Sequence, residues 1–418
     1  MRFLRTSSTT RLLATIAGVI AVIAAGAAIA VAATSSDPIP KSEPLAQAIH
    51  AGLSATRPSS ISADINFTNN LISSSDFTGG AHDPLLQGAS GRLWISGQQA
   101  RVELQTTNGD AELLVNGHSF WLSDPATHTV YQGTIPSSST SGSSTGSSNS
   151  SSSSSSTTTT SSSDTVPSIS QIQTKIDNLM SHLDLSGATT SDPTDVNGLG
   201  AYSVSISPKH SAGMIGSLQL AWDAIRGVPL QFSVFARGNS TPVLQLTLSK
   251  VSYDSVSSSD FAIQPPSDYT KVAVATSPSP SQTSGSGSST PVHGLAAVQA
   301  KVPFTVSAPV SVVGLTQKDV TLLDWGSHPA ALVTYGQGIG AIAVIEQSAS
   351  SARSLGGSGA HGPSGLALPT VSINGSTGQE LDTALGTMIR VTHGGVAYTV
   401  IGSVTPPAAE QAARALVP

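Results

Sequence analysis

The chain has 418 residues, of which 38% are hydrophobic, 10% charged and only 4% aromatic. The charged fraction is well below the roughly 25% usual for soluble domains. With a net charge of −6, the composition offers no basic surface for phosphate backbones, so we expect no nucleic acid partner. The chain contains no cysteine, which excludes disulfides, thiolate nucleophiles, cysteine-ligated metals and a lipid-modified cysteine anchor.

The amino terminus predicts export. Arg2, Arg5 and Arg11 precede residues 12–33, a run of 22 residues without a charge, which is long enough to cross a bilayer. Because a basic flank stays in the cytoplasm, the rest of the chain is expected outside. The length favours a retained anchor, whereas small residues near the end of the run also fit a cleaved signal peptide. We therefore predict either attachment to the extracytoplasmic face of the membrane through residues 1–33 or secretion.

Shifts in composition divide the rest of the chain. Residues 137–163 are almost entirely Ser, Thr and Gly, so they are expected to form a disordered insertion. Residues 275–291 have the composition of a flexible linker, and residues 348–365 are interpreted as a flexible Gly- and Ser-rich loop. The sequence thus predicts one domain over residues 41–273 and a smaller one over residues 292–418.

The first domain is predicted to be a curled antiparallel sheet covered by two helices. Ser42 is expected to cap a helix over residues 45–53, and apolar spacing predicts a second helix over residues 169–183. Strand-like alternation of apolar residues recurs at 61–67, 93–95, 102–104, 113–122, 202–206, 218–222, 230–234 and 244–248. A twisted open sheet of about ten strands rarely stays flat. We therefore expect an α+β half-barrel with an apolar concave face.

Apolar positions on these strands are candidates for lining that concave face. If the register is as predicted, the following residues point inward: Phe67, Leu93, Ile95, Val102, Leu104, Leu113, Val115, Phe120, Leu122, Leu220, Phe232 and Leu246. A one-residue slip would turn each of them outward. Two interpretations remain open, an ordinary filled core and a concave apolar site that binds a ligand.

The second domain is expected to be small and α+β. A short helix is predicted from residue 295, followed by an extended segment at Val302-Pro303-Phe304. Strands are predicted at 331–335 and 341–346, and a hairpin at 389–400. Because proline is tolerated in a first helical turn, Pro406 is expected to begin a terminal helix that ends at Leu416.

The motifs that suggest chemistry do not form a catalytic site. Residues 142–146 match G-x-S-x-G, but a nucleophile elbow needs a strand-to-helix turn and these lie in the Ser/Thr tract. The glycines of 336–340 precede a strand and not a helix, so a hairpin turn is predicted instead of a phosphate site. The ten histidines are scattered, and the closest carboxylate pairs, 110 with 112 and 192 with 195, are interpreted as solvated surface. We expect no enzyme, no metal and no cofactor.

Three segments carry a family resemblance. GRLWIS at 91–96, VNGHSFWLSDPATHTVYQ at 115–132 and FAIQPPSDYTKV at 261–272 resemble the bacterial lipoprotein-carrier (LolA-like) superfamily. That superfamily includes the RseB/MucB regulators of anti-sigma factors and the mycobacterial lipoprotein glycolipid carriers. The resemblance implies a half-barrel closed by helices over residues 41–273, with acyl chains of lipoproteins or lipids bound between them. Residues 292–418 resemble an uncharacterised extracytoplasmic domain of Gram-positive bacteria.

The chain departs from the carrier pattern at one place. In the periplasmic carriers, an arginine that follows the Gly-x-Leu-Trp strand helps to latch the helical lid. Residues 96–99 read Ser-Gly-Gln-Gln here, and the nearest arginine is Arg101. The load-and-release cycle of the carriers is therefore not carried over, although the capacity to house an apolar ligand is.

The main hypothesis is an exported, non-enzymatic protein that binds a lipid or acyl chain as a carrier or sensor. The alternative is an RseB/MucB-like regulatory module, whose carboxyl-terminal domain contacts a membrane protein such as an anti-sigma factor. A structural envelope protein with Ser/Thr tracts as spacers is a third hypothesis.

Overall fold

The computed structural model describes residues 39–72, 88–105, 110–125, 128–134, 166–183, 185–186, 190–209, 213–274, 292–324, 329–356 and 368–417. The predicted anchor over 12–33, the Ser/Thr insertion and the linker lie outside these residues. None of the helices in the described part of the chain has the length and apolar character needed to span a bilayer.

A 14-stranded sheet contains every described strand up to residue 274. Along the sheet the order is β1-β9-β10-β11-β12-β13-β2-β3-β4-β5-β6-β7-β14, and β8 pairs with β10 outside this path. In chain order the strands are β1 (Glu43–Pro44), β2 (Ser60–Asn69), β3 (Ala89–Ser96), β4 (Gln99–Gln105), β5 (Ala111–Asn116), β6 (Ser119–Asp124), β7 (Thr129–Thr134), β8 (Leu185–Ser186), β9 (Thr190–Val196), β10 (Leu199–Pro208), β11 (Ile215–Asp223), β12 (Pro229–Ala236), β13 (Pro242–Ser252) and β14 (Thr270–Val274).

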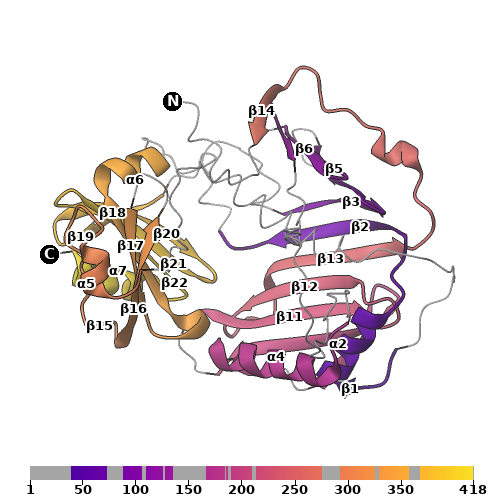
Figure 1. Ribbon diagram of the computed structural model, residues 1–418, viewed down its shortest axis with the longest axis horizontal. Helices are drawn as coiled ribbons and strands as arrows, with labels where there is room; N and C mark the ends of the chain where they lie inside the picture. The colour runs from indigo at the N-terminus through magenta and orange to yellow at the C-terminus, as the bar shows by residue number, and fades with distance from the viewer. Residues whose placement is uncertain are drawn as a thin grey trace, which may run out of the picture.

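This sheet consists of two antiparallel meanders joined edge to edge. Strands β2 to β7 form one and β9 to β13 the other, and β13 pairs antiparallel with β2 to connect them. The last strand, β14, lies parallel to β7. Figure 1 shows the sheet curling away from β11, β12 and β13 toward β5, β6 and β14. The predicted α+β fold with a curled half-barrel sheet is confirmed.

Two helices cover the β9–β11 side of the sheet (Figure 1). They are α2 (Leu45–Ser54) and α4 (Ile169–His182). Ser168 caps α4, and its hydroxyl and the Gln171 side chain form a reciprocal capping box, which satisfies two amide groups of the first turn.

The predicted cap of the first helix is wrong. The Ser42 hydroxyl donates to the carbonyl of Ser191, 3.2 Å away, and not to the helix. The reason is that Glu43 and Pro44 are extended and pair with β9, so α2 begins only at Leu45, with Pro44 in the cap position.

The apolar stripe of α4 packs only in its middle. Ile172 is buried, and Ile176 and Met180 contact the Tyr202–Trp222 cluster of the sheet. Leu179, predicted to lie on the buried face, remains 52% exposed. The apolar face of a helix covers a broad arc, and the part of this one that holds Leu179 stays exposed.

Helix α2 is seated against the turn that joins β11 and β12. Gly227 has a φ of +67°, and a Cβ at this residue would overlap the carbonyl oxygen of Gly52 in α2. A Cβ at Gly52 would in turn lie 3.4 Å from the Trp222 ring. Two glycines therefore permit the close approach between the helix and the sheet.

A second, 8-stranded antiparallel sheet contains the described strands after residue 310. Its order is β15 (Ser311–Val312), β16 (Leu315–Asp324), β17 (Pro329–Tyr335), β18 (Ile342–Ser348), β22 (Val396–Gly402), β21 (Gly386–His393), β20 (Ser376–Thr383) and β19 (Thr370–Ile373). Helices α5 (Leu295–Gln299) and α7 (Pro406–Leu416) cover one face. The predicted helix from Pro406 to Leu416 is confirmed.

The predicted loop over 348–365 is corrected in its first part. Residues Ala349–Gly356 form helix α6, and residues 357–365 lie outside the described part of the chain. Ser348 accounts for this helix, because its hydroxyl accepts the amide of Ser351, as an N-cap residue does.

We predict that Gly227→Ala destabilises the protein by about 3 kcal/mol, since it adds backbone strain and an overlap with α2. Gly238→Ala is the matched control: Gly238 has a φ of +72°, but a Cβ there meets nothing within 4 Å. The control should cost about 1 kcal/mol. Chemical denaturation of both variants measures the difference, and equal losses would contradict the proposed close contact.

Candidate functional site

The strand register places all twelve predicted lining residues on one face of the large sheet. Leu93, Val102, Leu113 and Leu122 are direct cross-strand partners in series. Val115 pairs with Phe120, and the remaining positions follow by the two-residue alternation of the pleat. This face also carries the side chains that contact the covering helices, and we call it the concave face.

The twelve residues differ in how completely the fold buries them. Leu93, Ile95 and Val102 are at most 5% exposed and belong to a closed core. Leu220 is 39% exposed and Phe232 is 41% exposed. The others are partly buried: Phe67, Leu104, Leu113, Val115, Phe120, Leu122 and Leu246. The concave face is therefore filled at β3–β4 and open at β11–β12.

The open part is a continuous apolar row across four strands. Leu220 pairs with Phe232, Phe232 with Leu246, and Leu246 with Phe67. Strands lie about 4.8 Å apart, so the row extends over roughly 14 Å. We call these four residues the concave row.

The concave row ends next to the place where α2 and α4 pack against the sheet. Tyr202 and Trp222 are buried under α2 and α4, with ring centroids 6.1 Å apart. Burial raises the pKa of Tyr202, and the nearby Glu43 carboxylate, to which its phenol is hydrogen-bonded, raises it further. Glu43 lies two residues before α2, so this bond helps to position the helix over the sheet.

The convex face carries the arginine that the sequence singled out. Arg101 donates to Glu112 at 2.7 Å and to Glu103 at 3.1 Å, and its guanidinium lies 4.8 Å from the Trp94 ring centroid. It also donates to the carbonyl of Asp260 in η2 (Ser258–Phe261), 3.2 Å away. Arg101 thus binds the outer connection, on the opposite face of the sheet from α2 and α4.

Two histidines beside the second sheet lie close to a hydroxyl group: His393 Nδ1 is 2.9 Å from the Ser376 hydroxyl, and His293 Nδ1 is 3.3 Å from the Thr321 hydroxyl. His293 Nδ1 also lies 2.8 Å from the Asp319 carboxylate. The Thr321 hydroxyl donates to the same Asp319 oxygen, so its proton is not directed toward the imidazole. Residues 336–340 join β17 to β18 through the short η3 turn (Gly338–Gly340), as the hairpin prediction required.

No group of three or more His, Asp or Glu side chains in the described ranges is arranged to hold a metal ion. Of the two carboxylate pairs noted in the sequence, Glu112 is engaged by Arg101 and Asp195 accepts the amide of Gly198. That the protein has no catalytic activity and no cofactor stays a prediction.

Comparison with known proteins gives distant structural likenesses. No protein-family model and no curated protein matches the chain. The MucA/MucB complex of Pseudomonas aeruginosa contains a chain of 13% identity with a TM-score of 0.38, and the match covers 88% of this chain and 96% of that one. An uncharacterised conserved protein from Thermus thermophilus matches at 8% identity and a TM-score of 0.30, over 55% of this chain and 97% of that one. Likenesses this distant carry no argument about ligand or partner.

We predict that Arg101→Met destabilises the protein by about 2 kcal/mol, because Glu103 and Glu112 are direct cross-strand partners and would then face each other as unpaired like charges. Adding Glu112→Gln should recover most of the loss. The control is Arg92→Met, whose side chain is 63% exposed and 3.9 Å from Asp64; its effect should stay within about 0.5 kcal/mol. Urea denaturation of the three variants tests the assignment, which fails if Glu112→Gln gives no recovery.

Proposed function

We propose that this protein is an exported, non-enzymatic binding protein that holds a lipid or acyl chain on the concave face of its larger sheet. The observation that carries the proposal is the concave row, where two large apolar side chains remain about 40% exposed beside a closed core. Membership of the LolA-like superfamily and attachment to the outer face of the membrane are parts of this proposal.

The chemistry of the row fits an apolar ligand. Small-molecule sites are concave and mostly apolar, with a few polar groups, and the concave row contains only Leu and Phe. Burying its exposed surface under a ligand would contribute about 25 cal/mol for each Å² of apolar area removed from water. A long acyl chain presents such area and few hydrogen-bonding groups, so it matches this surface better than a sugar or nucleotide does.

The first test is to identify what the protein carries. Residues 34–418 are expressed in a lipid-replete host and purified without detergent, and an organic extract is analysed by mass spectrometry. We expect one lipid class at near one-to-one stoichiometry. An empty extract from folded protein, together with no binding of an added labelled fatty acid, would contradict the proposal.

The second test locates the ligand. Leu220→Ser combined with Phe232→Ser should weaken binding of an anthroyloxy-labelled stearate about tenfold or more, which corresponds to at least about 1.4 kcal/mol. Ile401→Ser is the matched control, because Ile401 is 42% exposed but lies in the second sheet. Equal loss in the control, or none in the double variant, would place the ligand elsewhere.

The regulatory alternative makes a different prediction for the same material. An empty extract and a stoichiometric membrane protein recovered with the chain would favour an interaction module that contacts a partner such as an anti-sigma factor.

A further inference from the structure

A glutamate lies in the hydrophobic core of the second sheet. Glu346 of β18 is fully buried, on the same strand face as Ile342 and Val344. Its cross-strand partners are Ala331 on β17 and Tyr398 on β22. Carboxylates are almost never fully buried unless they are paired, so the group requires an explanation.

The carboxyl group has a single hydrogen-bond donor. Its Oε2 accepts the backbone amide of Ser307 at 2.9 Å. Its Oε1 and the hydroxyl of Tyr335 are buried, and neither finds a partner among the residues that the structure describes. An ionised carboxylate offers about four acceptor sites, so one donor leaves most of its charge uncompensated.

Ser307 connects the end of α7 to the second sheet. Its hydroxyl donates to the carbonyl of Leu416 at the end of α7, 2.8 Å away. The segment before it is held in shape by Gln299, whose side chain bonds the carbonyl of Phe304 and the amide of Val306. The Ser307–Glu346 bond therefore ties this segment, and through it the end of α7, to the sheet.

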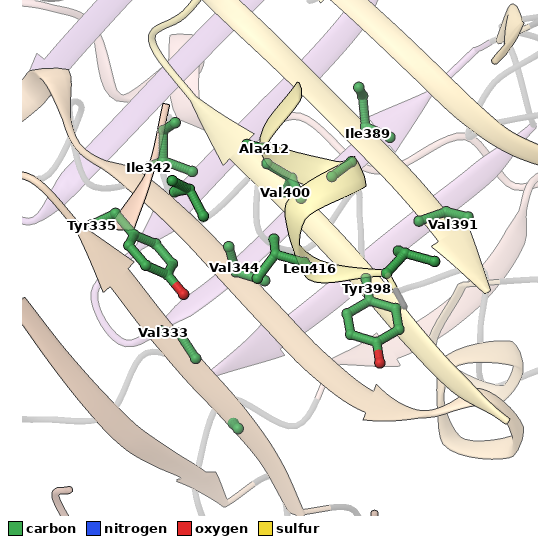
Figure 2. Close-up of a cluster of buried hydrophobic side chains, with 14 of the residues drawn as sticks. Val333, Tyr335, Ile342, Val344, Ile389, Val391, Tyr398, Val400, Ala412 and Leu416 are labelled. Atoms are coloured by element: carbon green, nitrogen blue, oxygen red, sulfur yellow. The ribbon is translucent and has the colours of Figure 1, made fainter. Parts of the chain in front are cut away.

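Among the residues that the structure describes, no cation faces Glu346 to hold it ionised. The titratable groups facing it are Tyr335 and Tyr398, and Figure 2 shows their rings on either side of Val344 and Leu416. On α7, Glu410 and Arg414 pair with each other. Burial raises the pKa of Glu346 to about 7, and the Ser307 amide lowers it by less.

We propose that Glu346 is a proton-controlled latch, which holds the segment around Ser307 and the end of α7 against the sheet while it is neutral and loosens them when it ionises. An acid with a raised folded-state pKa stabilises the fold only while protonated. Its contribution is complete below about pH 4.5, its ordinary pKa, and is lost as the pH rises toward about 7.

Hydrogen exchange of the full chain tests the latch. Protection factors at residues 302–307 and 409–417 should fall on the order of 100-fold between pH 5 and pH 8 in the wild type. Glu346→Gln keeps an oxygen for the Ser307 amide and does not titrate, so its protection should stay nearly constant. Asp110→Asn removes an exposed carboxylate that precedes β5 of the larger sheet; it is the control and should behave as the wild type.

Equal loss of protection in the wild type and Glu346→Gln would overturn the proposal. If Glu346→Gln does not fold, the wild type alone tests the proposal. The latch predicts that protection falls only at residues 302–307 and 409–417, while β2 and β3 stay protected. A uniform loss across both sheets contradicts it. This outcome is independent of any lipid on the concave face.

Discussion

The antiparallel pairing of β13 with β2 is the contact on which the larger sheet depends. It brings a strand that begins at Pro242 beside one that begins at Ser60, and so joins two local meanders into one curled surface. Because cross-strand partners share a face, this single register continues the apolar side of one meander into the other. A slip of one residue would place the apolar sides of the two meanders on opposite faces of the sheet. The continuous core and the concave row would then be lost.

The same pairing separates the roles of the two sheet faces. The concave side packs tightly at β3–β4 and remains open where Leu220 and Phe232 lie. The convex side carries the charged ladder in which Arg101 holds Glu103, Glu112 and the outer connection. The helices cover only the β9–β13 meander, where Gly52 and Gly227 allow α2 to approach the strands closely. The apolar row is left beside the helices and not beneath them.

The second sheet is covered on one face by a different kind of layer. Its covering layer is built from a short helix, an extended segment and the last helix of the chain. The Ser307 bridge between Glu346 and Leu416 helps to attach this layer, and the Asn374 side chain, in the turn between β19 and β20, donates to the carbonyls of Arg414 and Val417 at the end of α7. The two sheets also touch directly, since Met214 and Ile215 donate their amides to the Ser403 hydroxyl. They are not joined by the linker alone.

The sequence by itself determined the elements with strong periodicity: the alternating strands, the amphipathic helix α4 and the helix that begins at Pro406. Alternation alone also selected twelve apolar positions that share one face of the large sheet. It failed at Ser42, where pairing with β9 replaced the expected cap, and it missed the polar or short strands β9, β14, β16, β19 and β20. Only the tertiary structure decided which apolar residues are filled core and which stay open, because burial depends on what packs opposite. For the same reason it alone revealed Glu346, whose neighbours come from segments far apart in the chain.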